Sequence, residues 1–313
     1  MRRAAVALGM LLGMLACHQR LPPLDDHQAR VRFRPIERDQ LADVLRSAPR
    51  RDEDRLNQLA AQFRGVGCEE LAFRPVLRAP HPNLVCILPG ESSQRIVVGA
   101  NYDRPSGSRG FVENWSGSVM LPALYWAISS ERRHHTFEFV GFSNATRRRV
   151  LAATETWNLG SRHFLRSQTR EEVAKIRAMV NLIALGLGET SAWGDQGDPE
   201  LFVDLGSVAA AMSLPLRVRN FRPFFYADAL QFQMNGVPSI TIHSYDQVSY
   251  YLVSDPTRDN SPDRIDPDAY LASYRLVAAY LAYLDQSLVA RATKQLRASG
   301  AAAQGEAQQA DPQ

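Results

Sequence analysis

The sequence predicts an α/β fold in which helices cover both faces of a mostly parallel central sheet, a three-layer sandwich. Apolar runs that end in polar residues, such as residues 95–102 (RIVVGANY), are typical of buried parallel strands. Helical segments with capping signals separate these runs, as at residues 169–172 (TREE). Strands and helices that alternate in this way favour helical layers packed on a sheet. The 313 residues, 45% of them hydrophobic, suffice for one large domain or two small ones.

The first element is expected to be an export signal rather than part of the fold. In residues 1–17 (MRRAAVALGMLLGMLAC), Arg2 and Arg3 precede an apolar run that is too short for a permanent membrane helix. The run ends in LAC, which resembles a bacterial lipoprotein signal with Cys17 as the lipidated residue. The alternative is an ordinary cleaved signal with an incidental cysteine. Because His18 rather than aspartate follows, we expect a lipoprotein anchored to the membrane of the bacterial envelope, on the periplasm-facing side of the outer membrane.

Three further segments are expected after the signal. Residues 18–50 are rich in proline and charge, and they are interpreted as a tether that leads into a first helix. Residues 51–288 are expected to form the α/β domain. Residues 289–313 consist mainly of alanine, glutamine and other small or polar residues, so we expect a disordered tail that cannot bury enough apolar surface to order itself.

A β-hairpin is predicted at the start of the domain, from residues 71–77 and 84–88. Cys68 and Cys86 flank it, and disulfides persist in exported proteins. The two cysteines are not symmetric about the turn, so a direct cross-strand bond needs a bulge or a shifted register. The sequence therefore leaves open whether Cys68 and Cys86 are bonded.

The later elements alternate regularly. Asp198 and Asp266 each precede a proline, which is typical of an N-cap followed by proline at the first helical position. In a parallel sheet, ligands gather at the carboxyl ends of the strands. In chain order we expect strands at 95–102, 136–142, 178–185 and 236–244, and helices at 117–130, from 170 onward, at 199–212 and from 267 onward.

The formal charge of +3 is small, and the arginines are scattered along the chain. Composition therefore shows no stripe of basic residues of the kind that binds nucleic acid, and we expect no nucleic-acid partner. The run at residues 147–149 (RRR) is interpreted as a solvated loop rather than a phosphate patch.

Several blocks together resemble the aminopeptidase Y and bacterial leucyl aminopeptidase family of di-zinc exopeptidases (metallopeptidase family twenty-eight). The resemblance runs from about residue 55 to 286, with the blocks in the family's order and with fitting gaps. The blocks are NLVCILPGESSQRIVVGANYD, GFVENWSG, FVGF followed by GSRHF, MVNLIALG, YADALQF and GVPSITIHS.

The resemblance implies a zinc-exopeptidase fold and a defined chemistry. In this family two zinc ions hold a bridging water and lower its pKa. A carboxylate bridges the ions, further histidine and carboxylate ligands complete the set, and a separate glutamate acts as general base.

At four of these positions the sequence departs from the family pattern. The first histidine position is Asn101, a poor substitute for a zinc-binding nitrogen. The bridging position is Glu113, one methylene longer than aspartate, and the aspartate of the N-L-D block is Ile183, which cannot ligate a metal. Asp103 and Asp228 match acids that the family keeps around the site, although the histidine that follows the latter is Ala229 here.

The position of the glutamate pair, which holds the general base and a ligand, has two alignments. Matched from the preceding strand, the pair is Ala145 and Thr146; matched backward from the following GSRHF block, it is Thr154 and Glu155. Neither alignment keeps the general base, so the sequence offers no catalytic residue. The late histidine falls on Asp255, with Pro256 as the alternative one residue later.

We therefore expect a pseudopeptidase that binds a peptide or protein partner in the family cleft and holds no zinc. Glu113, Glu155 and Asp255 form the remaining candidate metal site, which would suit one hard divalent cation. The alternative function is an active metal-dependent aminopeptidase or other hydrolase built on those three carboxylates. His243 follows a predicted strand, and it is interpreted as bonded to neighbouring backbone rather than as a replacement ligand.

Overall fold

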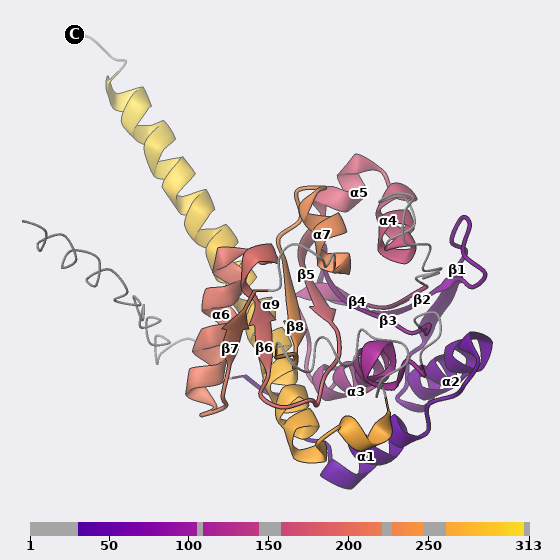
Figure 1. Ribbon diagram of the computed structural model, residues 1–313. Helices are drawn as coiled ribbons and strands as arrows, with labels where there is room; N and C mark the ends of the chain where they lie inside the picture. The colour runs from indigo at the N-terminus through magenta and orange to yellow at the C-terminus, as the bar shows by residue number, and fades with distance from the viewer. Residues whose placement is uncertain (1–30, 105–108, 144–157, 221–226, 247–260, 310–313) are drawn as a thin grey trace, which may run out of the picture.

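An eight-stranded mixed sheet runs through the middle of the protein in this computed structural model, which describes residues 31–104, 109–143, 158–220, 227–246 and 261–309 (Figure 1). The strand order is β1-β2-β4-β3-β5-β8-β6-β7. The strands are β1 (Glu70–Arg74), β2 (Asn83–Leu88), β3 (Ser92–Asn101), β4 (His135–Phe142), β5 (Ile176–Leu182), β6 (Ser191–Trp193), β7 (Arg217–Arg219) and β8 (Ser239–His243).

The four central strands, β4, β3, β5 and β8, are parallel, whereas the strands beside them include antiparallel pairs. Alternate residues of β3 belong to different apolar clusters: Ile96 and Val98 contribute to one and Val97 to the other. Because successive side chains of a strand point to opposite faces, both faces of the sheet are buried. The predicted α/β architecture with a buried, largely parallel centre is confirmed.

Helices cover the two faces of the sheet. Helices α4, α5 and α7 lie on one face, and α1, α2 and α3 lie on the other, with α6 and α9 packed together beside β8 (Figure 1). The helices are α1 (Arg38–Arg46), α2 (Asp52–Gly65), α3 (Gly117–Ile128), α4 (Leu159–Arg166), α5 (Arg170–Ala174), α6 (Pro199–Ala211), α7 (Asp228–Gln233) and α9 (Pro267–Gln309), with short helical turns at Phe111–Ser116, Gly194–Gln196 and Pro262–Arg264.

The predicted helix starts are confirmed by their caps. The Thr169 hydroxyl accepts from the backbone N–H of Glu172, and the Glu172 carboxylate accepts from that of Thr169, which makes a complete capping box. The Asp198 carboxylate accepts from the first backbone N–H groups of α6, and Asp266 does the same for α9. These capping contacts join residues close together in the chain, which explains why the helix starts could be predicted from the sequence.

The structure differs from the expected boundaries at both ends of the domain. Helix α1 lies within the predicted tether, 18–50, yet it buries Leu41 and Leu45 in the main core. The predicted disordered tail, 289–313, continues α9 as far as Gln309 and projects from the body (Figure 1). That segment is rich in alanine, glutamine, lysine and arginine, which propagate a helix once a packed portion has nucleated it.

The hairpin pairs β1 with β2, with Leu71 opposite Cys86. Cys68 lies before β1, where its backbone N–H donates to the Phe63 carbonyl oxygen at the end of α2. The two cysteines form a disulfide, with their Cα atoms 6.3 Å apart. Cys68 therefore needs no cross-strand position, because it reaches Cys86 from the turn that leads into the hairpin.

Candidate functional site

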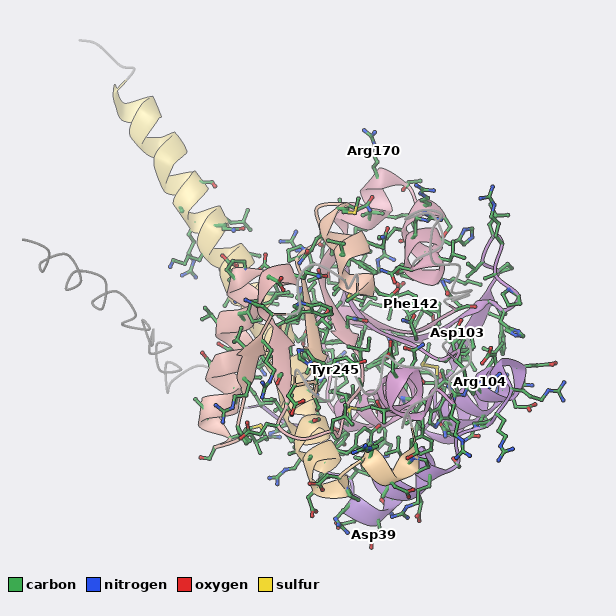
Figure 2. The ribbon with its side chains drawn as sticks, viewed as in Figure 1. Asp39, Asp103, Arg104, Phe142, Arg170 and Tyr245 are labelled. Atoms are coloured by element: carbon green, nitrogen blue, oxygen red, sulfur yellow. A yellow bond between two sulfur atoms is a disulfide. The ribbon has the colours of Figure 1, made fainter. Side chains whose placement is uncertain are left out.

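The carboxyl end of β3 carries the first position for which the resemblance implies a ligand. Asn101 is the last residue of β3, and the buried Asp103 lies near Phe142 at the end of β4 (Figure 2). The backbone N–H of Tyr102 donates to the Phe142 carbonyl oxygen at 3.2 Å, and the side-chain amide of Asn114 donates to the backbone carbonyl of Asp103 at 2.8 Å. These bonds fix the ends of the two strands to the segment that follows them.

A buried carboxylate is bonded to this strand end. Asp228, the first residue of α7, accepts from the Ser161 hydroxyl of α4 at 2.6 Å and from the side chain of Asn101. Burial raises the pKa of Asp228 to about 6, and the two hydrogen bonds limit the rise because they favour the ionised carboxylate. The Asn101 amide is therefore bonded to a protein carboxylate where the resemblance implies a zinc-binding histidine.

The end of β5 places an apolar side chain at another ligand position. Ile183 is buried in the main core, and its backbone N–H donates to the carbonyl of Ile242 in β8 at 3.1 Å. Asn181, which matches the asparagine of the family block, donates from its amide to the Thr241 hydroxyl at 3.4 Å. The backbone scaffold of this strand end matches the resemblance, whereas the side chain that should bind zinc is a hydrocarbon.

Glu113 lies on the helical turn Phe111–Ser116, half-buried. This turn is anchored at Ser116, whose hydroxyl accepts from the backbone N–H of Leu185 at 2.9 Å. The Ser116 carbonyl accepts from the phenol of Tyr270, on α9, at 2.6 Å. Glu113 therefore lies on a turn that is hydrogen-bonded to the segment following β5.

A buried arginine supports the same region from α2. The Arg55 guanidinium donates to the backbone carbonyls of Pro49, Tyr102 and Arg109 at 2.9, 3.3 and 2.7 Å, and it lies over the Trp115 ring. Burial lowers the pKa of Arg55 to about 10, which still leaves it charged at neutral pH. Arg55 joins the end of β3 to the segment that leads into the Glu113 turn.

His243 ends β8, and its surroundings are aromatic. Its Nδ1 accepts from the backbone N–H of Tyr245 at 3.0 Å, and its ring contacts the rings of Trp193 and Tyr245. Burial lowers the pKa of His243 to about 3, so the imidazole is neutral at physiological pH. The interpretation of His243 as a residue bonded to neighbouring backbone is confirmed.

The remaining predicted positions lie outside the described residues; these are Cys17, Ala145, Thr146, Thr154, Glu155 and Asp255. Among the residues that the structure describes, no group of three or more histidine, cysteine, aspartate or glutamate side chains could hold a metal ion. Two of the described ligand positions, Asn101 and Ile183, do not fit zinc, because one is an amide bonded to Asp228 and the other is apolar.

Sequence reasoning did not find the role of Arg55 or the bonds among Asn101, Ser161 and Asp228. One signal for Arg55 was available, since it shares a face of α2 with buried Leu59 and so occupies a core position. The bonds to Asp228 join three elements that are far apart in the chain, and no local sequence pattern predicts such a contact.

Comparison with sequence models of protein families identifies one family. The sequence model of Peptidase family M28 matches residues 83–281. A search of curated proteins finds no match.

Solved structures with a similar fold include two aminopeptidases and a glutaminyl cyclase. The zinc aminopeptidase BSAP from Bacillus subtilis is 18% identical with a TM-score of 0.54, and the match covers 64% of this chain but only 49% of the Bacillus enzyme. Legionella LapA is 16% identical with a TM-score of 0.65, covering 80% of this chain and 74% of LapA. The Acidobacteriales bacterium glutaminyl cyclase is 15% identical with a TM-score of 0.67, covering 83% of this chain and 98% of the cyclase.

Proposed function

The chain belongs to peptidase family M28, and we propose that it is a non-catalytic member that binds a peptide or protein partner at the carboxyl end of the sheet. The observation that carries this proposal is the hydrogen bonding of Asn101. Its amide N–H is bonded to Asp228, which also accepts from Ser161, whereas the buried Asn101 Oδ1 has no hydrogen-bond partner among the described residues. An active di-zinc site would need a nitrogen ligand directed at a metal from this position.

Ile183 supports the same proposal from the neighbouring strand. A buried isoleucine gives a metal ion no lone pair, and burying an ion beside it would carry a large desolvation cost. The general base is also absent from both alignments of the sequence, and the loss of such a base alone lowers a rate by about 10²–10⁴. Together these changes remove the nucleophile as well as the group that would activate it.

The localisation is part of the proposal. The signal at residues 1–17 supports export, and Cys17 supports lipidation and an envelope membrane anchor. Within the described residues, no helix is long and apolar enough to span a membrane. The Cys68–Cys86 disulfide agrees with an oxidising compartment.

Metal content and turnover, measured on one sample, test the catalytic half of the proposal. The purified full chain should hold less than one equivalent of zinc by elemental analysis. It should not release product from aminoacyl chromogenic substrates or cyclise an N-terminal glutaminyl peptide, with or without added zinc. Two equivalents of tightly held zinc with turnover would refute the proposal. Glu155→Gln is the diagnostic variant, because loss of a measured activity in that variant would establish the alternative hydrolase with a rebuilt carboxylate site.

Peptide binding tests the other half. Fluorescence anisotropy with a labelled peptide library should find peptides that the full chain binds. The variant Glu113→Gln should weaken binding if the carboxyl end of the sheet is the binding surface, whereas Glu69→Gln, at an exposed position before β1, should not. Equal binding by both variants and the original protein would exclude this surface.

A further inference from the structure

A pocket of about 810 Å³ opens at the other end of the sheet from the strand ends described above. It is lined by residues from the end of α4, from α5, from the start of β5 and from the segment between α7 and β8. Strand β5 runs from Ile176, in the pocket, to Leu182, beside the candidate site. At about 3.3 Å per residue, the two locations are roughly 20 Å apart.

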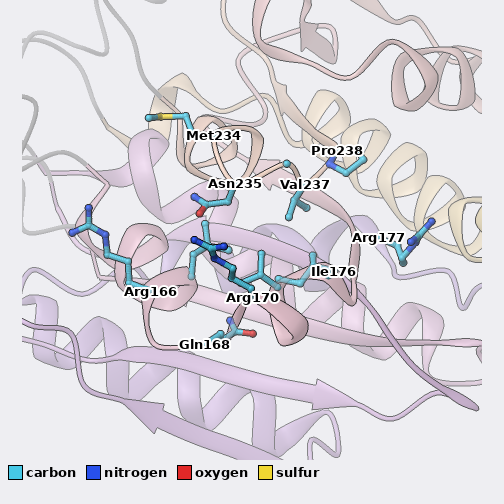
Figure 3. A pocket seen from close by; sticks show the side chains of 13 residues that line it. Arg166, Gln168, Arg170, Ile176, Arg177, Met234, Asn235, Val237 and Pro238 are labelled. Carbon is cyan, nitrogen blue, oxygen red and sulfur yellow. The ribbon is translucent and has the colours of Figure 1, made fainter.

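The pocket has an apolar floor and a cationic rim. Leu165, Ile176 and Val237 line it and are buried. The rim carries arginines 166, 170 and 177, all exposed, and no acidic residue lines the pocket. Figure 3 shows arginines 166 and 177 toward opposite sides, with the third arginine and Asn235 between them.

The nearby acids are already engaged elsewhere. Glu171 lies 3.8 Å from the Lys175 ammonium, and Glu172 is bonded to Thr169 in the capping box. Arg95, on the adjacent strand, is paired with Glu138 instead. Among the described residues, no carboxylate is within ion-pair distance of the three rim arginines. The rim therefore presents three positive charges without acidic partners.

We propose that this arginine pocket binds an anion that carries two or more phosphate groups. A guanidinium donates through a planar fork that matches phosphate oxygens, and a tetrahedral phosphate can accept from several directions at once. The three arginine guanidinium groups come from α4, α5 and β5, so one small monovalent anion would leave at least one of them without a hydrogen-bonding partner. The volume lies within the range of small-molecule sites. The ligand source is either a soluble polyphosphorylated molecule or a lipid headgroup that carries two phosphates.

The pocket is built on rigid elements, which favours a preformed site. Gln168 accepts from Arg95 at 2.8 Å and donates to the carbonyl of Phe164 at 2.8 Å, so the link between α4 and α5 is braced. The capping box fixes the start of α5, where Arg170 lies. A preformed cationic rim reduces the conformational entropy that the side chains lose when the anion binds.

Isothermal titration calorimetry of the full chain with inorganic pyrophosphate tests the proposal. The heat of binding should fit one site, and the affinity should fall as sodium chloride is added, because exposed charges are screened. Each of Arg170→Glu and Arg177→Glu should weaken binding about tenfold or more, since each removes a charge-assisted hydrogen bond. Arg170→Lys should retain part of the affinity, because it keeps the charge without the fork.

Arg132→Glu is the matched control, since Arg132 is an exposed arginine outside the pocket. It should bind pyrophosphate as the original chain does. Thermal unfolding of every variant should match the original, and Arg177→Gln replaces any charge reversal that does not fold. Equal weakening by the control, or no pyrophosphate binding, would overturn the proposal.

Two further arms identify the source of the anion. Co-sedimentation with phosphatidylcholine vesicles that contain cardiolipin, whose headgroup carries two phosphates, should depend on Arg170 and Arg177 if the ligand is a headgroup. Pyrophosphate binding without vesicle binding assigns a soluble ligand. Binding of polyglutamate through the same arginines, with no affinity for pyrophosphate, would overturn the assignment to phosphate.

Discussion

Replacing Asp228 by asparagine tests whether the buried carboxylate is bonded as the structure shows. The substitution keeps the side-chain shape and one acceptor oxygen, which can serve the Ser161 hydroxyl, and it replaces the other carboxylate oxygen by an amide group that does not ionise. Asp228 is fully buried, and its pKa is raised from the ordinary value of 3.8 to about 6, chiefly by burial. Each pKa unit corresponds to about 1.4 kcal/mol, so the difference between folded and unfolded states is worth about 3 kcal/mol at most.

The sign of the pH dependence of stability follows from which state, folded or unfolded, binds the Asp228 proton more tightly. The folded protein holds the Asp228 proton to a higher pH than the unfolded chain does. This group therefore contributes stability that is fully present below about pH 4 and is lost as the pH rises through 6. Because asparagine does not titrate, Asp228→Asn should gain about 2 kcal/mol of unfolding free energy relative to the original protein between pH 4 and pH 7.

Urea unfolding followed by circular dichroism at several pH values measures this difference. Asp39→Asn, at an exposed position on α1, controls for the loss of a surface carboxylate. A constant difference between Asp228→Asn and the original protein across this pH range would refute the buried-carboxylate reasoning. A difference of the opposite sign would show that the hydrogen bonds from Ser161 and Asn101 outweigh burial.

Three other variants test the scaffold. Replacing Cys68 and Cys86 together by serine should lower the unfolding free energy by about 3 kcal/mol, because the disulfide closes a chain segment of 18 residues. Urea unfolding of the original protein in the presence of reductant should show the same loss. Arg55→Met should cost about 3 kcal/mol in the same assay, because it leaves three backbone carbonyls without their donor, and an unchanged midpoint would contradict that role. Truncation after Thr293 should change stability by less than about 0.5 kcal/mol, since residues 294–299 are exposed, and a larger loss would show that the end of α9 packs on the body.

The sequence predicted the central elements of the fold because their signals are local. The apolar run of β3 and the caps of α5, α6 and α9 act within a few residues. Strands β6 and β7, the last two at one side of the sheet, were not predicted, since three residues carry too little periodicity to distinguish a strand from a loop. The extension of α9 was missed because low hydrophobicity was interpreted as disorder, whereas its composition also has high helix propensity.

The candidate site was predictable by position but not by contact. Comparison with the family pattern placed Asn101, Glu113 and Ile183 at strand ends. In the structure Asn101 is the last residue of β3, Glu113 lies in the turn before α3, and Ile183 follows β5. The partners of Asn101 could not be predicted, because Ser161 and Asp228 come from two other helices. The rim arginines were also missed, since they are 11 residues apart at most in sequence yet line one pocket only after β5 joins the sheet.

The structure shows why the fold does not depend on the residues at the ligand positions. A side chain at Gly117 would meet the Leu182 carbonyl oxygen at 2.5 Å, and one at Gly160 would meet the Asn83 amide oxygen at 2.7 Å. These glycines are required because helices α3 and α4 approach the ends of the strands closely, a packing constraint that applies with or without metal. Ligand positions carry no such constraint, and apolar Ile183 packs in the core there. Substitutions that remove zinc binding therefore need not destabilise the protein, whereas substitutions at these glycines would.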